Sequence, residues 1–139
     1  DTYLEVLQGS VRSQMFRHLY MSVDGKKRDV TENGKLACAF FVSFILAGLG
    51  LIKRFHGTVD ATVEDMKESG WKLVKKPKPG DVLVWEKMKI NGRANRHIGF
   101  YVLSVWALSN HYDDGEPIFH HWKYGGTREV EMIFRRSFS

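Results

Sequence analysis

The stretch Ala37-Cys38-Ala39-Phe40-Phe41-Val42-Ser43-Phe44-Ile45-Leu46 decides the fold of this chain. It belongs to a longer run, residues 36–52, that contains no charged residue. Such a run approaches the minimum length of a membrane span, but the glycines at 48 and 50 and a basic residue at each flank favour a helix that ends inside a globular protein. We therefore expect a central helix that is apolar all round because other elements cover it, and no transmembrane segment.

Cys38, the only cysteine of the chain, opens this helix. A helix N-terminus carries unpaired N–H groups and the positive end of the helix dipole, and both favour a thiolate over a thiol. The position makes Cys38 a candidate nucleophile, although a lone cysteine in an apolar helix is also commonly a small core residue. Because one cysteine forms no internal disulfide, the redox compartment is left open.

The composition is that of a globular protein. The chain has 139 residues, 43% hydrophobic and 13% aromatic, which suits a single domain over residues 1–139. Its formal net charge of +5 suits an anionic partner. The basic residues are scattered and accompany no nucleic-acid-binding motif, so we expect no nucleic acid partner. We also expect a monomer. The compartment is not fixed, since a chain that starts with Asp1 is compatible with removal of an export signal.

Helical patterns precede extended ones along the chain. Apolar spacing predicts a helix within residues 1–20, a turn at Val23–Lys27 predicts a hairpin, and a further helix is expected after a cap at Thr58 or Asp60, ended by Gly70. β-Branched and aromatic residues dominate after this helix. Helices followed by a meandering antiparallel sheet predict an α+β fold. The expected strands cover residues 82–85, 97–102, 105–109, 118–122 and 128–134, with turns at 91–92, 114–115 and 125–126.

A histidine stands where a cysteine nucleophile needs a base. Cysteine hydrolases require a thiolate, a histidine that exchanges a proton with it and a third polar group that orients the imidazole. His97 begins one expected strand, which follows the strand introduced by Pro79-Gly80-Asp81. We expect Asp81 to close that turn through its side chain, and Gly99 to allow another backbone or a substrate to come close.

The order of these segments resembles that of the NlpC-type peptidoglycan endopeptidases and the related CHAP amidases. In those families a cysteine opens the central helix, a Gly-Asp pair introduces the first core strand, and a His-Val-Gly or His-Ile-Gly segment places the base on the next strand. This chain supplies Cys38-Ala39-Phe40-Phe41-Val42, Gly80-Asp81 and His97-Ile98-Gly99 in that order, so the resemblance covers roughly residues 33–111. It implies a compact papain-like fold with Cys38 and His97 as the catalytic pair.

The resemblance implies that the chain is a cysteine peptidase or amidase. Such an enzyme cleaves an amide or peptide bond in peptidoglycan peptides, and it is secreted or lies in the cell envelope. The NlpC pattern usually has Asp before the cysteine and Ser-Gly after it, whereas this chain has Ala37 and Ala39. Substrate preference therefore stays open. The same fold also suits an acyltransferase, a deamidase or a toxin that acts on a protein, or an inert binding module in which the thiol is buried.

Three residues are candidates for the group that orients His97. The strand after His97 returns through Ser109-Asn110-His111, and alternation places Ser109 and His111 on its face, while Asn110 reaches it only if the strand bulges or ends there. Asn and His are the better orienters, and Asn offers a fixed carbonyl acceptor. CHAP-like members use Asn or Glu at this place, and NlpC-like members commonly use His. We take Asn110 as the first choice, His111 as the second and Ser109 as a further alternative.

The remaining polar groups give an oxyanion donor and no metal site. The backbone N–H of Cys38 and the side chain of Tyr20 are the candidate donors to a tetrahedral intermediate. His120 and His121 are adjacent on an expected strand and point to opposite faces, so they do not chelate one metal ion together. A zinc site built from Cys38, His97 and His111 lacks recognised ligand spacing. We expect neither a metal nor a cofactor.

Overall fold

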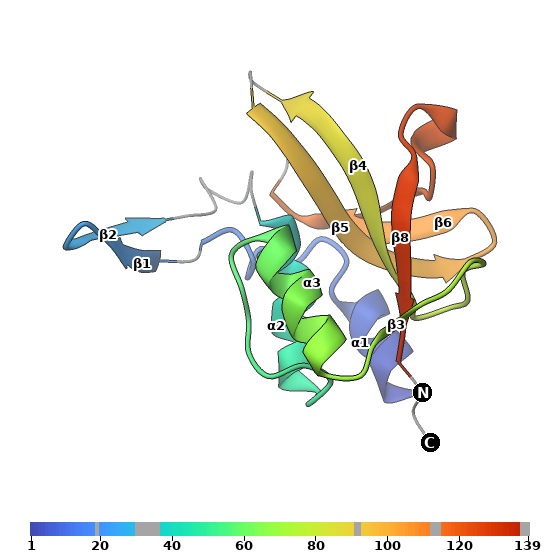
Figure 1. The fold of residues 1–139 in the computed structure, drawn as a ribbon, viewed down its shortest axis with the longest axis horizontal. Coiled ribbons are helices and arrows are strands. Elements are labelled where there is room, and N and C mark those ends of the chain that lie inside the picture. The colour runs from blue at the N-terminus through green and yellow to red at the C-terminus, as the bar shows by residue number, and fades with distance from the viewer. Residues whose placement is uncertain (19, 30–36, 91–92, 112–114, 137–139) are drawn as a thin grey trace.

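A computed structural model of the chain describes residues 1–18, 20–29, 37–90, 93–111 and 115–136. The helices in these ranges are α1 (Thr2–Gly9), α2 (Cys38–Gly48) and α3 (Val59–Glu68). Along the chain a six-stranded antiparallel sheet follows them, and a separate hairpin comes between α1 and α2 in the sequence (Figure 1). The strands are β1 (Tyr20–Val23) and β2 (Lys26–Asp29) in the hairpin, and β3 (Lys72–Leu73), β4 (Val82–Ile90), β5 (Arg93–Leu103), β6 (Trp106–Asn110), β7 (Pro117–His121) and β8 (Val130–Arg135) in the sheet.

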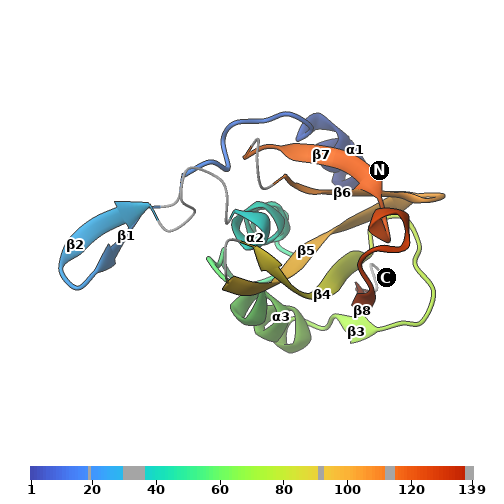
Figure 2. The same ribbon diagram turned by 90° about the horizontal axis from the view of Figure 1, so that it is seen from above.

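The sheet is curved and carries the helices on its concave side (Figure 2). Its strand order is β3-β8-β4-β5-β6-β7, so four consecutive strands form the expected meander. The expectation is wrong for the last strand, because β8 returns to pair with β4, where Val82 lies opposite Phe134. Both side chains are buried, so apolar burial favours this return. The short edge strand β3, which pairs with β8, was not expected, since both its residues are exposed and it has no apolar alternation.

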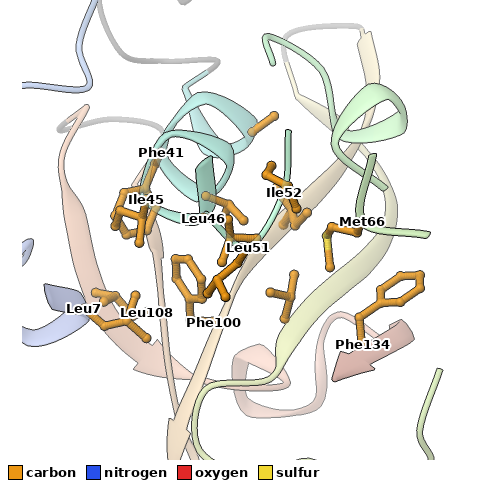
Figure 3. Packing of buried hydrophobic residues seen from close by; sticks show 14 of the residues in the cluster. Leu7, Phe41, Ile45, Leu46, Leu51, Ile52, Met66, Phe100, Leu108 and Phe134 are labelled. Atoms are coloured by element: carbon orange, nitrogen blue, oxygen red, sulfur yellow. The ribbon is translucent and has the colours of Figure 1, made fainter. Parts of the chain in front are cut away.

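The expected central helix is confirmed as α2. Phe41 and Leu46 are fully buried, and Figure 3 shows them packed with Phe100 of β5, Leu108 of β6 and other apolar side chains. The sheet and α3 cover most of the helix (Figure 2), but Phe44 is exposed, so the expectation that other elements cover it on every side is only partly right. None of the helices in the described ranges is long and apolar enough to cross a membrane.

The helix expected within residues 1–20 is confirmed only up to Gly9. Beyond it, the Ser10 hydroxyl donates to the Leu7 carbonyl at 2.6 Å, and Arg12 has a positive φ of 65°. The N–H of Arg12 then donates to the Pro117 carbonyl at 2.8 Å. This contact ties the segment to β7, so the tertiary structure ends the helix early.

Several expected turns and caps are confirmed. Thr58 caps α3 by accepting a hydrogen bond from the Ala61 N–H at 3.1 Å, and Gly70 follows the helix with a φ of +93°. The β1–β2 hairpin turns between Val23 and Lys26, and it projects away from the body of the molecule (Figure 1). The turn at 125–126 lies in η1 (Tyr124–Gly126). The turn at 91–92 and the first residue of the turn at 114–115 lie outside the described residues.

Asp81 closes its turn as expected. Its Oδ2 accepts a hydrogen bond from the Lys78 N–H at 2.8 Å. The guanidinium of Arg135 forms a bidentate salt bridge with the same carboxylate. Its Nε donates to Oδ1 at 2.9 Å and its Nη2 donates to Oδ2 at 2.7 Å. Asp81 therefore joins the start of β4 to the end of β8 and has a structural role.

Candidate active site

Strand β5 presents different side chains to its two faces. Ile98 and Phe100 belong to the main core beneath α2, whereas Tyr101 belongs to a second cluster on the other face, around Trp85. His97 shares this second face, since its ring lies 5.2 Å from that of Trp85. The first residue of the expected strand thus points its imidazole into a polar and aromatic cluster at one end of the sheet.

His97 is held by Ser109 of the neighbouring strand. Its Nε2 lies 2.8 Å from the Ser109 Oγ, and the hydroxyl is buried. The Ser109 Oγ also lies 2.7 Å from Nε2 of His120 on β7. These contacts leave Nδ1 of His97, the ring nitrogen nearer its own backbone, for another partner.

Gly99 allows this close approach, as the sequence predicts. A Cβ at Gly99 would lie 2.6 Å from the Ser109 Cβ and 2.7 Å from the Leu108 carbonyl oxygen. Real Cβ atoms do not come so close to other atoms, so a side chain at this position would push β6 away. The glycine therefore brings the Ser109 hydroxyl within reach of His97.

Cys38 approaches β5 at Ile98, the residue that follows His97. The last regular pair between β5 and β6 at this end of the sheet is Phe100 with Leu108, so the N–H of Ile98 is available beyond it. This N–H lies near enough to the sulfur of Cys38, the first residue of α2, to lower the pKa of the thiol. The thiol of α2 therefore lies at the residue of β5 that follows His97, and within the described ranges the thiol and the imidazole form no direct hydrogen bond.

The thiol of Cys38 is not a ready-made thiolate. Burial raises its pKa above the usual value of 9.0 and outweighs the N–H groups of Ile98, Ala39 and Cys38 itself and the positive charge of Arg128, all of which lower it. The helix N-terminus does favour the thiolate, as expected, but its effect on the pKa is smaller than the opposite effect of burial. At neutral pH the resting thiol keeps its proton and needs a base to remove it.

His97 is a neutral imidazole at neutral pH. Burial lowers its pKa well below 6.5, and the positive charge of Arg128 and the proximity of His120 and His111 lower it further. A neutral ring has a lone pair with which to accept a proton. The buried thiol and the buried imidazole thus form an uncharged pair at rest.

Arg128 is a buried cation beside this pair that the sequence pattern did not single out. Its Nε and Nη2 donate to the Glu86 carbonyl at 3.0 and 2.9 Å, and Nη2 also donates to the Asn95 carbonyl at 2.9 Å. Carbonyl oxygens leave the full positive charge in place, and it acts on both Cys38 and His97. No sequence signal marks this residue, since its position depends on how β8 returns to β4.

The other predicted site residues fall in different places. Asn110 is buried on β6, and alternation along the strand turns it away from the face that carries Ser109. His111 lies close enough to His97 to lower the pKa of that imidazole. Tyr20 is half exposed on the projecting hairpin, with its ring stacked on His18 and under the Lys27 ammonium. The structure therefore brings Ser109 to His97 and places Tyr20 on the separate hairpin.

Two further residues complete the cluster. His120 stacks on Tyr124 with ring centroids 4.4 Å apart and an interplanar angle of 16°. Both rings also lie against Trp85, at 5.4 and 5.5 Å. The sequence showed that His120 faces away from His121, but the pairing of β6 with β7 was needed to place it beside Ser109. In the part of the chain that the structure describes, no group of three or more His, Cys, Asp or Glu side chains is arranged to hold a metal ion.

Comparison with known proteins supports the fold. No family model matches the sequence, and no curated protein matches it. The chain is similar in structure to NlpC2 from Trichomonas vaginalis, with a TM-score of 0.58 and 14% sequence identity. The match covers 96% of this chain and 45% of that one, so the chain spans less than half the length of this neighbour. The chain has an NlpC-like fold, a mixed α/β architecture with an antiparallel sheet.

Proposed function

We propose that this chain is a papain-like thiol hydrolase in which Cys38 is the nucleophile and His97 is the base. The observation that carries the proposal is that the Cys38 sulfur lies near the N–H of Ile98, the residue that follows His97. Nε2 of His97 in turn lies 2.8 Å from the Ser109 hydroxyl. A thiol, a neutral imidazole and a polar group that orients it are the three parts of a cysteine hydrolase. In this proposal Ser109 takes the orienting role expected of Asn110.

The reaction begins with a proton transfer from the Cys38 thiol to Nδ1 of His97. The sulfur attacks the carbonyl carbon of an amide, and the charge on the carbonyl oxygen is stabilised by the backbone N–H of Cys38 at the start of α2. His97 then returns the proton to the leaving amine as the C–N bond breaks. Water, deprotonated by His97, hydrolyses the thioester and restores the thiol. The charge of Arg128 favours the thiolate throughout.

Peptides of the bacterial cell wall are the proposed substrate. The support is the NlpC-like fold, the order of the segments around Cys38, Gly80-Asp81 and His97, and the net charge of +5, which suits an anionic polymer. The absence of the usual residues beside the cysteine, with Ala37 and Ala39 in their place, allows a preference for a different peptide bond.

Digestion of purified peptidoglycan tests the proposal. We expect the wild-type protein to release soluble fragments with new amino termini, because hydrolysis of an amide frees an amine. Cys38→Ala removes the nucleophile and should abolish release. Gly48→Ala is a matched control at the other end of α2, since a Cβ there meets nothing within 4 Å. Equal release by Cys38→Ala and the wild-type protein would show that the nucleophile is wrongly assigned.

The raised pKa of the Cys38 thiol favours one alternative, an inert binding module of the same fold. The two functions differ in whether His97 activates the sulfur. In an enzyme the sulfur reacts with electrophiles in the folded state and depends on the imidazole. In a binding module it reacts only after unfolding.

A further inference from the structure

One hydroxyl joins two imidazoles in the cluster. The Ser109 Oγ lies 2.8 Å from Nε2 of His97 and 2.7 Å from Nε2 of His120. A serine hydroxyl has a single proton, so it donates to one of these nitrogens and accepts from the other. The direction of this donation decides which nitrogen of His97 carries a proton, and so whether the ring presents a lone pair or an N–H on its other side.

The far side of His120 fixes the direction. Its Nδ1 lies 2.9 Å from the carbonyl oxygen of His121, which only accepts hydrogen bonds, so Nδ1 carries a proton. Burial lowers the pKa of His120 to about 4, so the ring is neutral at pH 7 and its Nε2 has a lone pair. The Ser109 hydroxyl therefore donates to His120, and its oxygen accepts the proton of His97 Nε2.

We propose that His120 is a positioning residue that acts through Ser109 to hold His97 in the tautomer protonated on Nε2. The lone pair of His97 then lies on Nδ1, the nitrogen nearer the backbone that contacts the Cys38 sulfur. The opposite tautomer would present an N–H to the thiol and could not accept its proton. The functional part of this inference rests on the proposed function, in which Nδ1 is the base.

The surroundings of His120 hold its ring in the required plane. Tyr124 stacks on one face, and Trp85 packs nearby. A second hydroxyl, that of Tyr124, lies 3.5 Å from His120 Nε2, farther than that of Ser109, and it also interacts with the Ser109 side chain. Pairing of β6 with β7 places Ala107 opposite His120 and Ser109 opposite Ile118, so Ser109 and His120 are diagonal neighbours on one face.

Two-bond ¹⁵N–¹H correlation spectra of the imidazoles at neutral pH test the proposal directly, because they show which ring nitrogen carries a proton. In the wild-type protein we expect His97 to be protonated on Nε2 and His120 on Nδ1. A wild-type spectrum with His97 protonated on Nδ1 would overturn the proposal, and this reading needs no variant to fold.

Two variants show whether His120 is the cause. His120→Phe keeps a ring on Tyr124 but removes the acceptor, so the Ser109 hydroxyl is free to donate to His97 and the Nδ1-protonated tautomer should gain population. Tyr124→Phe removes the more distant hydroxyl and should leave the tautomer of His97 unchanged. An unchanged tautomer in His120→Phe, or a change in Tyr124→Phe instead, would contradict the assignment.

Kinetics separate this inference from the proposed function. His120→Phe should lower kcat about 10- to 100-fold with little change in KM, the size of the loss when the partner that orients a metal-bound imidazole is removed. His120→Gln, whose amide oxygen can accept from Ser109, should recover part of the loss. If the spectra show the expected tautomers while no substrate is cleaved, the proposed function fails and the positioning role stands. If cleavage depends on Cys38 but not on His120, the positioning role fails alone.

Discussion

At the scale of single residues, the candidate site combines an uncharged thiol, which lies at Ile98, with the uncharged imidazole of the preceding residue, His97. Burial raises the pKa of Cys38 and lowers that of His97, so each group rests in its neutral form at pH 7. A preformed thiolate and imidazolium pair is therefore disfavoured before substrate arrives. Desolvation has a larger effect here than the helix N-terminus, which explains why the position of Cys38 alone did not predict its charge.

The pH dependence of hydrolysis follows from these two shifts. His97 gains a proton only below its lowered pKa, so activity should persist at pH 6 and fall only when the pH drops well below 6.5. The alkaline limit should lie above pH 9, where the thiol itself ionises. The profile of kcat/KM against pH measures both limits. An acid limb centred at pH 6.5 or higher would contradict the buried, neutral imidazole.

Asp65 is a buried carboxylate with a structural role. Burial raises its pKa, but hydrogen bonds to the carboxylate outweigh burial and lower the pKa to about 2. The partners are the Lys53 N–H at 3.0 Å, His56 Nε2 at 2.7 Å, the Ser69 hydroxyl at 3.0 Å and the Arg54 N–H at 3.2 Å. Because the pKa is lower in the folded state than its usual 3.8, the contribution to stability is present above pH 4 and is lost as the pH falls through 2.

Asp65→Asn should lower the free energy of unfolding at pH 7 by about 2 kcal/mol, the value of this pKa difference. Urea denaturation at pH 7 and pH 3 measures the effect, and the gap between variant and wild-type protein should narrow at the lower pH. A constant gap at both pH values would show that the charge of Asp65 is not the source of its contribution.

At the scale of elements, the site depends on two strands that lie unusually close. Gly99→Ala would place a methyl group 2.6 Å from the Ser109 Cβ and force β6 away from His97. We expect the free energy of unfolding to fall by about 1–3 kcal/mol, as for overpacked core positions, together with loss of hydrolysis.

Gly48→Ala is the control for this change, because its Cβ meets no atom within 4 Å at the end of α2. It should leave hydrolysis intact and stabilise the protein slightly, by about 0.5 kcal/mol, since alanine is the better helix former. Thermal or urea denaturation of the two variants checks both values. Equal stability of Gly99→Ala and the wild-type protein would mean that β5 and β6 separate without cost.

The elements themselves were largely predictable, and their partners were not. The apolar run after Cys38, the cap at Thr58 and the strand after His97 appear where local sequence places them. The return of β8 to β4 and the short strand β3 depend on long-range pairing that no local pattern encodes. For the same reason Ser109 was only one of three candidates, and Arg128 and His120 were not assigned to the site at all.

At the scale of the whole molecule, one curved sheet and one buried helix bring together residues far apart in sequence. Cys38 comes from the start of α2, His97 from β5, Ser109 from β6 and His120 from β7 (Figure 1). The order of the segments around Cys38, Gly80-Asp81 and His97 along the chain predicted that residues far apart in sequence come together. We propose that residues 1–139 act as one domain.

Labelling of Cys38 by iodoacetamide at pH 7 tests the central pairing of thiol and imidazole most directly. With a pKa above 9.0, less than about 1% of an unassisted thiol is ionised at this pH, so fast labelling requires His97. We predict that Cys38 of His97→Gln is labelled at least about tenfold more slowly than Cys38 of the wild-type protein. In His18→Gln, a change at an exposed site, Cys38 should be labelled at the wild-type rate. In denaturant all three proteins should be labelled at the same rate. Equal rates for the folded wild-type and His97→Gln proteins, or labelling of the wild type only after unfolding, would contradict the account.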